Sequence, residues 1–215
     1  MMFKAIVLGR SVKMESQNWI VNGEGSCEAF DPNEFMPPVD PYRLYRFLTD
    51  LEDVLQSTED ARDRIQKICP LVRTLLTSSY WIQLENPEPS TKTGWGVRKL
   101  YKEPKFPLTI QLVTWLPGNV SRIHNHATWG IVALISGEEK NTFWRRSPDK
   151  QHPDRIQKTC EHVLVPGDII GFVPDAIHQV EPIGEEPTIT FNLYGITDYK
   201  QRFEFDAENQ TAKNF

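Results

Sequence analysis

The feature that most constrains the fold of this chain is a series of short, strand-like segments in its second half. Each segment is rich in β-branched or aromatic residues and is separated from the next by Pro, Gly, Asp or Ser. About seven such segments occupy roughly 90 residues, a spacing typical of a β-sandwich or a β-barrel. The predicted strands are 108–115, 130–135, 141–146, 161–165, 168–173, 178–183 and 188–195. We therefore predict an all-β fold built from these strands.

Two helices are predicted ahead of the strands. Apolar residues recur at spacings of three and four in 44–55 and again in 65–75, which is the period of an amphipathic helix. Pro70 lies inside the second stripe, where a proline kinks or splits a helix. The segment 86–93 is a loop by its composition and separates the helices from the strands.

The first 40 residues show neither a helical nor a strand period. Glycines and a Pro-Pro pair interrupt the pattern, so an irregular arm is predicted, with a strand near Phe3–Leu8 that joins the sheet. Residues 1–90 are thus expected to form an arm and a helical layer packed on a barrel of residues 91–215. Together the two parts would make one structural domain.

The composition limits the partners. Hydrophobic residues make up 39% of the 215 residues, which is enough for a packed interior. The formal charge of −5, without a long basic run, argues against binding nucleic acid or an anionic membrane, and the N-terminal apolar run is too short for a signal sequence or a bilayer span. Three widely spaced cysteines do not make a disulfide framework. These features predict a cytoplasmic protein, monomeric or homodimeric, that acts on a small molecule.

Two of the five histidines, His124 and His126, lie one residue apart in the segment RIHNHATWG. In an extended segment, residues i and i+2 point to the same side, so these two imidazoles can bind one metal ion. Histidines with this spacing also occur as ordinary core or rim residues with hydrogen bonds of their own. Downstream, VPGDIIGFVPDAIHQVEP contains turn residues that can bring His178 back to the pair as a third ligand.

From about residue 95 to 197 this pattern resembles the cupin superfamily. Gly118, a gap of five residues and then His124 and His126 match the first cupin motif, and a Pro-bearing turn before His178 matches the second. The resemblance implies a jelly-roll (double-stranded β-helix) barrel that is preceded by α-helices and holds a metal ion in its mouth.

The carboxylate ligand of many cupins is missing. Metal-binding cupins usually have a glutamate four or five residues after the second histidine, and this chain has Gly130 and Ile131 there. A site of three neutral imidazoles suits Fe(II), Ni, Cu or Zn and leaves positions open for substrate and dioxygen. Because such ligands carry no negative charge, the metal attracts an anionic donor such as a thiolate.

The segment H-x-H-x-T-W-G, here His124 to Gly130, resembles the thiol dioxygenases, the family of the cysteine and 3-mercaptopropionate dioxygenases. Trp115 and Tyr194 also match residues of that family. The resemblance implies an Fe(II) enzyme, with Ni or Zn as possible substitutes in a recombinant sample, that oxidises a small thiol with O₂ to its sulfinate. It further implies that the three histidines are ligands and that the Tyr194 hydroxyl faces the substrate or oxygen.

The candidate substrate residues depart from the family pattern. Asn192 stands where the family has the histidine of a Ser-x-His-x-Tyr triad, and an amide can hold the Tyr194 phenol but cannot titrate. The family clamps the substrate carboxylate with an arginine on the strand before the histidines. Arg98 falls at that distance, although a solvated surface arginine is an equal alternative, and Gln83 is its rival if the pocket resembles the mercaptopropionate enzymes. Trp129 is predicted either to line the pocket or to pack in the core.

Two other functions fit the same residues. One is another three-histidine cupin dioxygenase, acting on a dicarbonyl or aromatic substrate. The other is a metal-binding cupin without catalysis, which Asn192 favours, because a fold alone does not fix a function.

Several other polar residues are predicted to have no part in the site. His152 and His162 are expected at the surface, the Glu138-Glu139 pair in a solvated turn, and residues 206–215 in a frayed tail.

Overall fold

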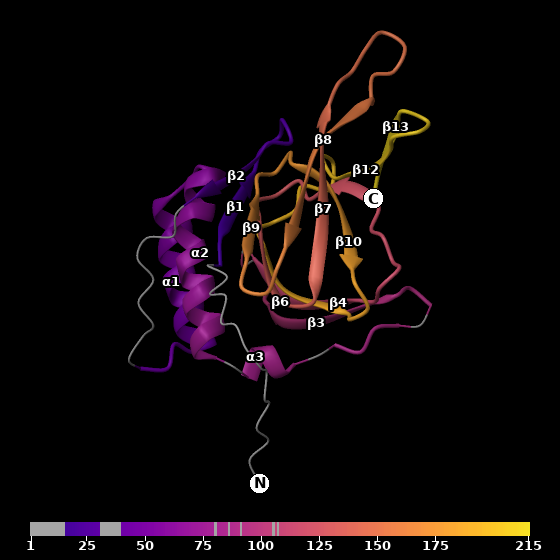
Figure 1. The fold of residues 1–215 in the computed structure, drawn as a ribbon. Coiled ribbons are helices and arrows are strands. Elements are labelled where there is room, and N and C mark those ends of the chain that lie inside the picture. Colours follow the sequence, from indigo (N-terminus) through magenta and orange to yellow (C-terminus); the bar gives the residue numbers. More distant parts are fainter. Residues whose placement is uncertain are drawn as a thin grey trace.

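The computed structural model describes residues 16–30, 40–79, 81–85, 87–90, 92–104, 106 and 108–215, without the side chain of Gln83. Two β-sheets form a barrel, and two long helices lie against one of them (Figure 1). The predicted all-β fold with an N-terminal helical layer is confirmed. The strand expected near Phe3–Leu8 lies outside the described residues.

The first sheet has seven strands in the order β2-β1-β9-β6-β11-β4-β3. Strand β1 runs parallel to β9, and the other neighbours are antiparallel. The strands are β1 Asn18–Val21, β2 Cys27–Phe30, β3 Trp95–Lys102, β4 Thr109–Trp115, β6 Gly130–Ser136, β9 Ile169–Phe172 and β11 Thr188–Tyr194.

The second sheet has six antiparallel strands in the order β13-β12-β5-β10-β7-β8. Its strands are β5 Ile123–Asn125, β7 Glu138–Arg146, β8 Ile156–Leu164, β10 Ile177–Ile183, β12 Phe203–Asp206 and β13 Thr211–Asn214. This sheet carries the histidine motif, because β5 and β10 are neighbours in it.

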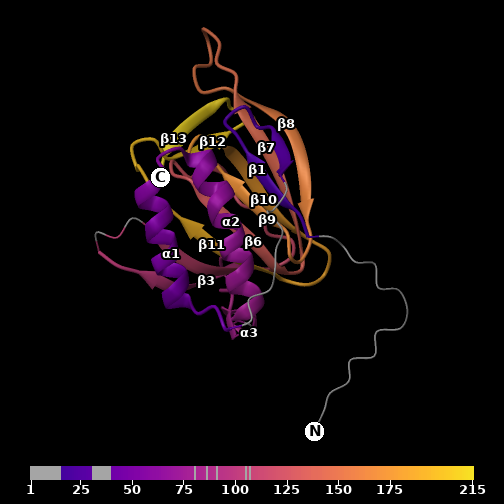
Figure 2. The same cartoon turned by 90° about the vertical axis from the view of Figure 1, so that its left-hand side faces the viewer.

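The helices α1 (Leu44–Ser57) and α2 (Ala61–Ser78) lie side by side on the outer face of the seven-stranded sheet, and the single turn α3 is Trp81–Leu84 (Figures 1 and 2). Asp60 caps α2, since its carboxylate accepts a hydrogen bond of 2.9 Å from the Asp63 N–H. Helix α2 continues through Pro70, which therefore does not split it. In the described parts of the chain no helix is long and apolar enough to cross a bilayer.

The two sheets contain strands, near both ends of the chain, that the sequence analysis did not predict. Part of the expected irregular arm forms β1 and β2, joined by a turn with Gly25 at φ +68°, and β1 pairs with β9 about 150 residues away. The edge strand β3 was not predicted, because its sequence WGVRKLYK is polar and has no clean alternation. The tail expected to fray, residues 206–215, forms the turn and the second strand of the hairpin β12–β13, and β12 pairs with β5.

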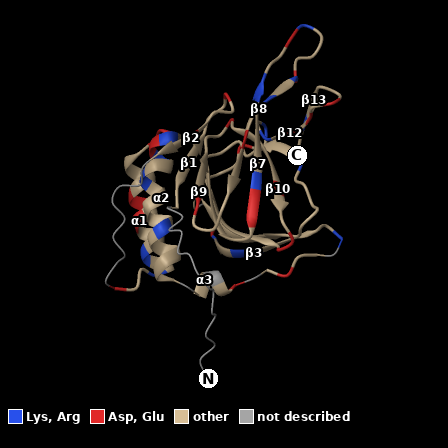
Figure 3. Ribbon diagram, in the orientation of Figure 1, with Lys and Arg blue, Asp and Glu red and all other residues tan. Residues whose placement is uncertain are grey.

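Buried apolar residues form two main layers. The larger one fills the space between the helices and the seven-stranded sheet and contains Phe47, Leu51, Ile65, Leu112 and Phe191. The second lies between the two sheets and surrounds Phe143 and Phe172. Acidic and basic residues, with both signs mixed, lie on the helices and at the hairpin tips (Figure 3). The barrel interior thus contains an apolar layer of its own, apart from the layer beneath the helices.

Candidate metal centre

Strands β5 and β10 bring the three histidines together. His124 and His178 are directly opposite each other in the antiparallel register, so their side chains lie on the same face of the sheet. His126 follows the end of β5 and is two residues from His124, which returns it to that face. The alternation predicted from the sequence therefore places all three imidazoles inside the barrel.

The ring nitrogens of the three histidines converge. One ring nitrogen from each lies within 4.8 Å of the others, and Nε2 of His126 is 2.9 Å from Nε2 of His178. Two nitrogens bound to one metal at about 2.0–2.1 Å would lie roughly 3 Å apart, so this spacing matches a shared ion. The described residues contain this one cluster of three or more potential ligand side chains, and it includes no carboxylate.

Hydrogen bonds fix which nitrogen of two of these rings is free. His124 Nδ1 lies 2.8 Å from the Arg122 carbonyl oxygen, and His178 Nδ1 lies 3.1 Å from Asn141 Oδ1. Both partners are acceptors, so each Nδ1 carries the proton and each Nε2 keeps its lone pair for a metal.

A buried carboxyl group extends the second of these contacts. The Asn141 amide donates to Glu139 Oε1 over 3.0 Å, and Glu139 is only 3% exposed. Burial raises the Glu139 pKa from 4.5 to about 7, while the hydrogen bond from Asn141 acts in the opposite direction. The expectation of a solvated Glu138-Glu139 turn is therefore wrong for Glu139, because β7 begins at Glu138 and its alternation points the next side chain inward.

Aromatic rings hold the third histidine. The His126 ring stacks on Tyr194, with centroids 4.6 Å apart and planes 23° apart, and Phe172 contacts both His126 and His178. Just beyond His126, Ala127 has φ +51°, a conformation that costs energy for a residue with a side chain. Its N–H donates to the Pro174 carbonyl over 3.0 Å, and this bond helps to hold the strained turn.

The histidines are neutral at physiological pH. Burial lowers the pKa of His124, and it lowers the pKa values of His126 and His178 well below 6.5. A neutral imidazole does not have to lose a proton before it binds a metal. Three converging neutral nitrogens, two of them with fixed tautomers, therefore fit a first-row transition metal.

Tyr194 and Asn192 form a fixed pair beside the cluster. The Tyr194 hydroxyl donates to Asn192 Oδ1 over 2.9 Å, and the Asn192 amide donates to Thr190 Oγ1 over 2.8 Å. Burial raises the Tyr194 pKa, so the phenol stays protonated. Asn192 is 5% exposed, and its hydrogen bond with the phenol fixes the orientation of the Tyr194 hydroxyl.

A glycine makes room for this phenol. Gly130 pairs with Tyr194 across β6 and β11, and a Cβ at Gly130 would lie 2.7 Å from Cδ1 of the Tyr194 ring. Any larger residue there would displace the ring. The stacked position of Tyr194 therefore depends on the glycine at 130.

Two of the predicted substrate residues, Arg98 and Trp129, do not lie beside the three histidines. Arg98 is paired with Leu112 in the register, on the face of the sheet that the helices cover, and its side chain is 56% exposed in an ion pair with Glu85. Trp129 is 6% exposed and packs in the core cluster with the helices, so the core interpretation of this residue is correct. The side chain of Gln83 lies outside the described residues.

Three contributors were missed by the sequence analysis. Asn141 and Glu139 give no local signal, since only the pairing of β7 with β10 places them behind His178. Phe215, in the segment expected to fray, has its ring centroid 6.1 Å from that of His124. The apolar alternation of FEFD in β12 was the available signal for an ordered C-terminal hairpin.

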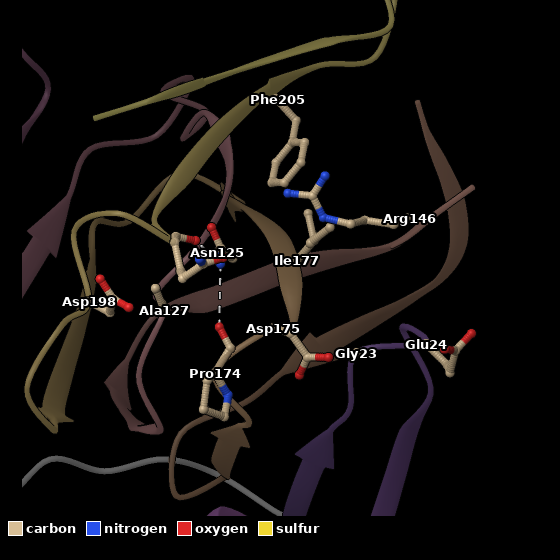
Figure 4. Close-up of a pocket in the computed structure, with 11 residues that line it drawn as sticks. Gly23, Glu24, Asn125, Ala127, Arg146, Pro174, Asp175, Ile177, Asp198 and Phe205 are labelled. Atoms are coloured by element: carbon tan, nitrogen blue, oxygen red, sulfur yellow. Dashed lines mark hydrogen bonds between the residues drawn. The ribbon is translucent and has the colours of Figure 1, made fainter. Parts of the chain in front are cut away.

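Residues of the same strands also line a surface pocket of about 440 Å³ (Figure 4). Asn125 and Ile177 line it, and these residues alternate along the strands with the metal-facing histidines. Arg146 packs its guanidinium 4.8 Å from the Phe205 ring centroid at this pocket. The pocket is therefore separate from the histidine cluster, and we assign the chemistry to the cluster.

Comparison with known proteins shows partial structural similarity. No family model matches the sequence. Oxalate oxidase in complex with glycolate overlaps at a TM-score of 0.41, with 14% identity over 52% of this chain and 55% of that chain. A cupin 2 conserved barrel domain protein from Salinispora arenicola overlaps at 0.38, with 16% identity over 58% of this chain and 87% of that chain.

A cupin 2 domain of an XRE family transcriptional regulator from Enterobacter cloacae also overlaps, at a TM-score of 0.36 and 17% identity over 48% of this chain and 97% of that chain. The alignment with oxalate oxidase covers 55% of that protein, so this chain spans about half of its length. These partial overlaps say nothing about the substrate or the reaction.

Proposed function

We propose that the protein is a non-haem iron thiol dioxygenase that oxidises a small thiol, of the cysteine or 3-mercaptopropionate type, to its sulfinate. The observation that carries the proposal is a cluster of three neutral histidines without a carboxylate, with Tyr194 stacked on one of them at 4.6 Å. The resemblance of His124 to Gly130 to the thiol dioxygenases supports it.

His124, His126 and His178 would hold Fe(II) through one nitrogen each. When bound, the iron would supply the site where thiolate and dioxygen react. In the overall reaction both atoms of O₂ are transferred to sulfur, the S–H proton is released, and sulfur is oxidised by four electrons while O₂ is reduced. Because the histidines contribute no negative charge, this centre favours an anionic sulfur over a neutral one.

The residues around the cluster position it and limit proton movement. Asn192 Oδ1 accepts a hydrogen bond from the Tyr194 hydroxyl, and a carboxamide does not titrate near neutral pH. Tyr194 therefore acts as an oriented hydrogen-bonding group, with its oxygen lone pairs free to accept from a ligand, and the pair does not form a proton relay. Phe172 packs against His126 and His178 and shields them from water.

The test is oxygen uptake by the protein after anaerobic reconstitution with Fe(II). Cysteine, 3-mercaptopropionate, cysteamine and a dicarbonyl would be supplied at equal concentration, and the sulfinate would be quantified. We expect uptake with one of the thiols, matched by its sulfinate. Uptake with only the dicarbonyl, or none from protein that holds one iron, would contradict the proposal.

Two histidine variants control this experiment. His126→Ala should lose iron and oxygen uptake together, because it removes one of the three ligands. His152→Ala is the matched control, since His152 lies in the exposed loop between β7 and β8, where its Nδ1 is 3.3 Å from Asp149 Oδ1. It should keep both iron and activity.

A further inference from the structure

The histidine cluster is open to solvent on one side. His178 is 3% exposed, whereas His124 and His126 are both partly exposed, so solvent reaches the cluster beside these two rings. Phe172, which packs against His126 and His178, is fully buried. The ring of Phe215 is 47% exposed, and its centroid lies 6.1 Å from that of His124. A ligand that enters beside His124 therefore meets the Phe215 ring.

Strand pairing places the Phe215 side chain on the face of the sheet that carries the histidines. Strand β12 lies between β5 and β13, and Glu204 is opposite His124 on one side and opposite Lys213 on the other. Side chains that are directly opposite share a face, and the Lys213 ammonium is 3.7 Å from the Glu204 carboxylate. Phe215 is two residues beyond Lys213, so the alternation turns its ring to the same face.

Contacts on the backbone and on the ring hold Phe215 at this position. Its N–H donates to the Arg202 carbonyl over 3.4 Å, which continues the pairing one residue past β13. The neighbouring Asn214 amide donates to the carbonyls of Lys200 and Arg202, over 3.1 Å each. The guanidinium carbon of Arg202 lies 4.3 Å from the Phe215 ring centroid, and this stacking orients the ring.

The Phe215 ring contacts the site and not the core. It belongs to none of the three buried apolar clusters of the described residues. Its ring neighbours are His124 and Arg202. The Tyr194 ring stacks on His126, so aromatic rings flank both partly exposed histidines. A ligand of the metal has to fit beside these rings.

We infer that Phe215 is a specificity-determining residue of this site, whose ring forms the outer wall beside His124 and limits the width of the ligands that reach the metal. A ligand with a single chain next to its donor atom fits beside such a wall, and a ligand with a bulky group there collides with it. In an apolar wall, a difference of one methylene changes binding by about 10- to 200-fold. The inference rests on the proposed function for the class of ligand, a thiol, but not for the limit on its width.

The test uses the full chain loaded with Co(II), whose absorption spectrum reports the binding of a thiolate under anaerobic conditions. The two probes are 2-mercaptoethanol, which is slim, and benzyl mercaptan, which has a ring next to the carbon that carries sulfur. The quantity that decides is the ratio of the two affinities. Phe215→Ala should shift this ratio by about 10-fold or more in favour of benzyl mercaptan and leave the affinity for 2-mercaptoethanol within about threefold.

Tyr199→Ala is the matched control, because it removes an aromatic ring that is 69% exposed from the segment that the Asn214 amide also approaches. It should keep the wild-type ratio. An unchanged ratio in Phe215→Ala, binding of neither thiol by that variant, or an equal shift in Tyr199→Ala would overturn the inference. If Phe215→Ala no longer holds one Co(II), Phe215→Leu, which keeps an apolar side chain without the ring, decides by the same ratio.

Oxygen uptake by the iron-loaded wild type separates this inference from the proposed function. A ratio that depends on Phe215, without oxygen uptake for any thiol, would support the wall and contradict the dioxygenase proposal. Oxidation of a thiol by the wild type, together with a ratio that Phe215→Ala does not change, would support the reaction and contradict the wall.

Discussion

The two faces of strand β11 are both buried but have opposite characters. On the face toward the helices, Phe191 and Leu193 are fully buried in an apolar core. On the face toward the barrel interior, Thr190, Asn192 and Tyr194 form a continuous chain of hydrogen bonds that ends beside the histidines. The contrast shows that burial stabilises the fold on one face, whereas on the other it sets the protonation and orientation of polar groups.

The largest change in the free energy of unfolding is expected from a substitution on the face of β11 that packs against the helices. Phe191→Ala should lower the free energy of unfolding by about 3–5 kcal/mol, because Phe191 is fully buried and its removal leaves a cavity beneath the helices. Chemical denaturation measures this loss. The protein that remains folded should still bind one metal ion, and a loss below about 1 kcal/mol would show that this face is not the main core.

The next largest effect is a dependence of the stability on pH, which arises from the buried Glu139 in the barrel interior. The Glu139 pKa is raised from 4.5 to about 7 in the folded protein, so the folded state binds this proton more tightly than the unfolded state does. The stability from this group is present below pH 4.5 and is lost as the pH rises to about 7, by roughly 3 kcal/mol. Glu139→Gln cannot ionise and keeps an oxygen that accepts from Asn141.

Relative to the wild type, Glu139→Gln should therefore gain stability between pH 4.5 and 7 and gain no more above that range. Denaturation of both metal-free proteins at each pH gives this difference and cancels the contribution of the histidines. A difference that does not change with pH would show that Glu139 is not the buried neutral acid described above.

A smaller effect is expected from a substitution at Asn141, which should lower the metal affinity more than it lowers the stability of the fold. Asn141→Leu removes the acceptor that keeps the proton on Nδ1 of His178 and should weaken metal binding by about 10- to 100-fold. Competition with a chelator measures the affinity. Asn209→Leu, on the exposed turn between β12 and β13, should bind metal like the wild type. Equal affinities in both variants would remove Asn141 from the site.

The smallest effect is expected from Tyr194→Phe. The change leaves the ring stacked on His126 but removes the donor to Asn192 Oδ1, so unfolding should become easier by about 0.5–1.5 kcal/mol. Metal affinity should stay within about threefold of the wild type. A loss of metal from the folded variant would mean that the hydroxyl, and not the ring, supports the cluster.

The histidine cluster was predictable because it depends on local spacing. The i, i+2 pair sets a common face, and the turns before His178 place a third imidazole opposite, whichever strands surround them. The two helices and most barrel strands were predictable for the same reason, because the spacing of their apolar residues can be recognised within a short stretch of sequence.

The missed features depend on long-range pairing. Strand β1 is a strand because it pairs with β9, and Glu139 is buried because β7 pairs with β10. Arg98 was placed by counting residues to the histidines, but counting does not fix the side of a strand, and β3 has an irregular register between Lys99 and Tyr101. A shift of one residue turns every side chain to the other face.

The central claim is that His124, His126 and His178 bind one metal ion. The most direct measurement is the ¹⁵N NMR spectrum of the histidine rings before and after addition of one equivalent of Zn(II). We expect one ring nitrogen of each of the three to shift, with Nδ1 protonated in His124 and His178, while His152 and His162 do not change. A spectrum in which these three rings are unaffected by the metal, or in which His152 or His162 shifts in their place, would contradict the claim.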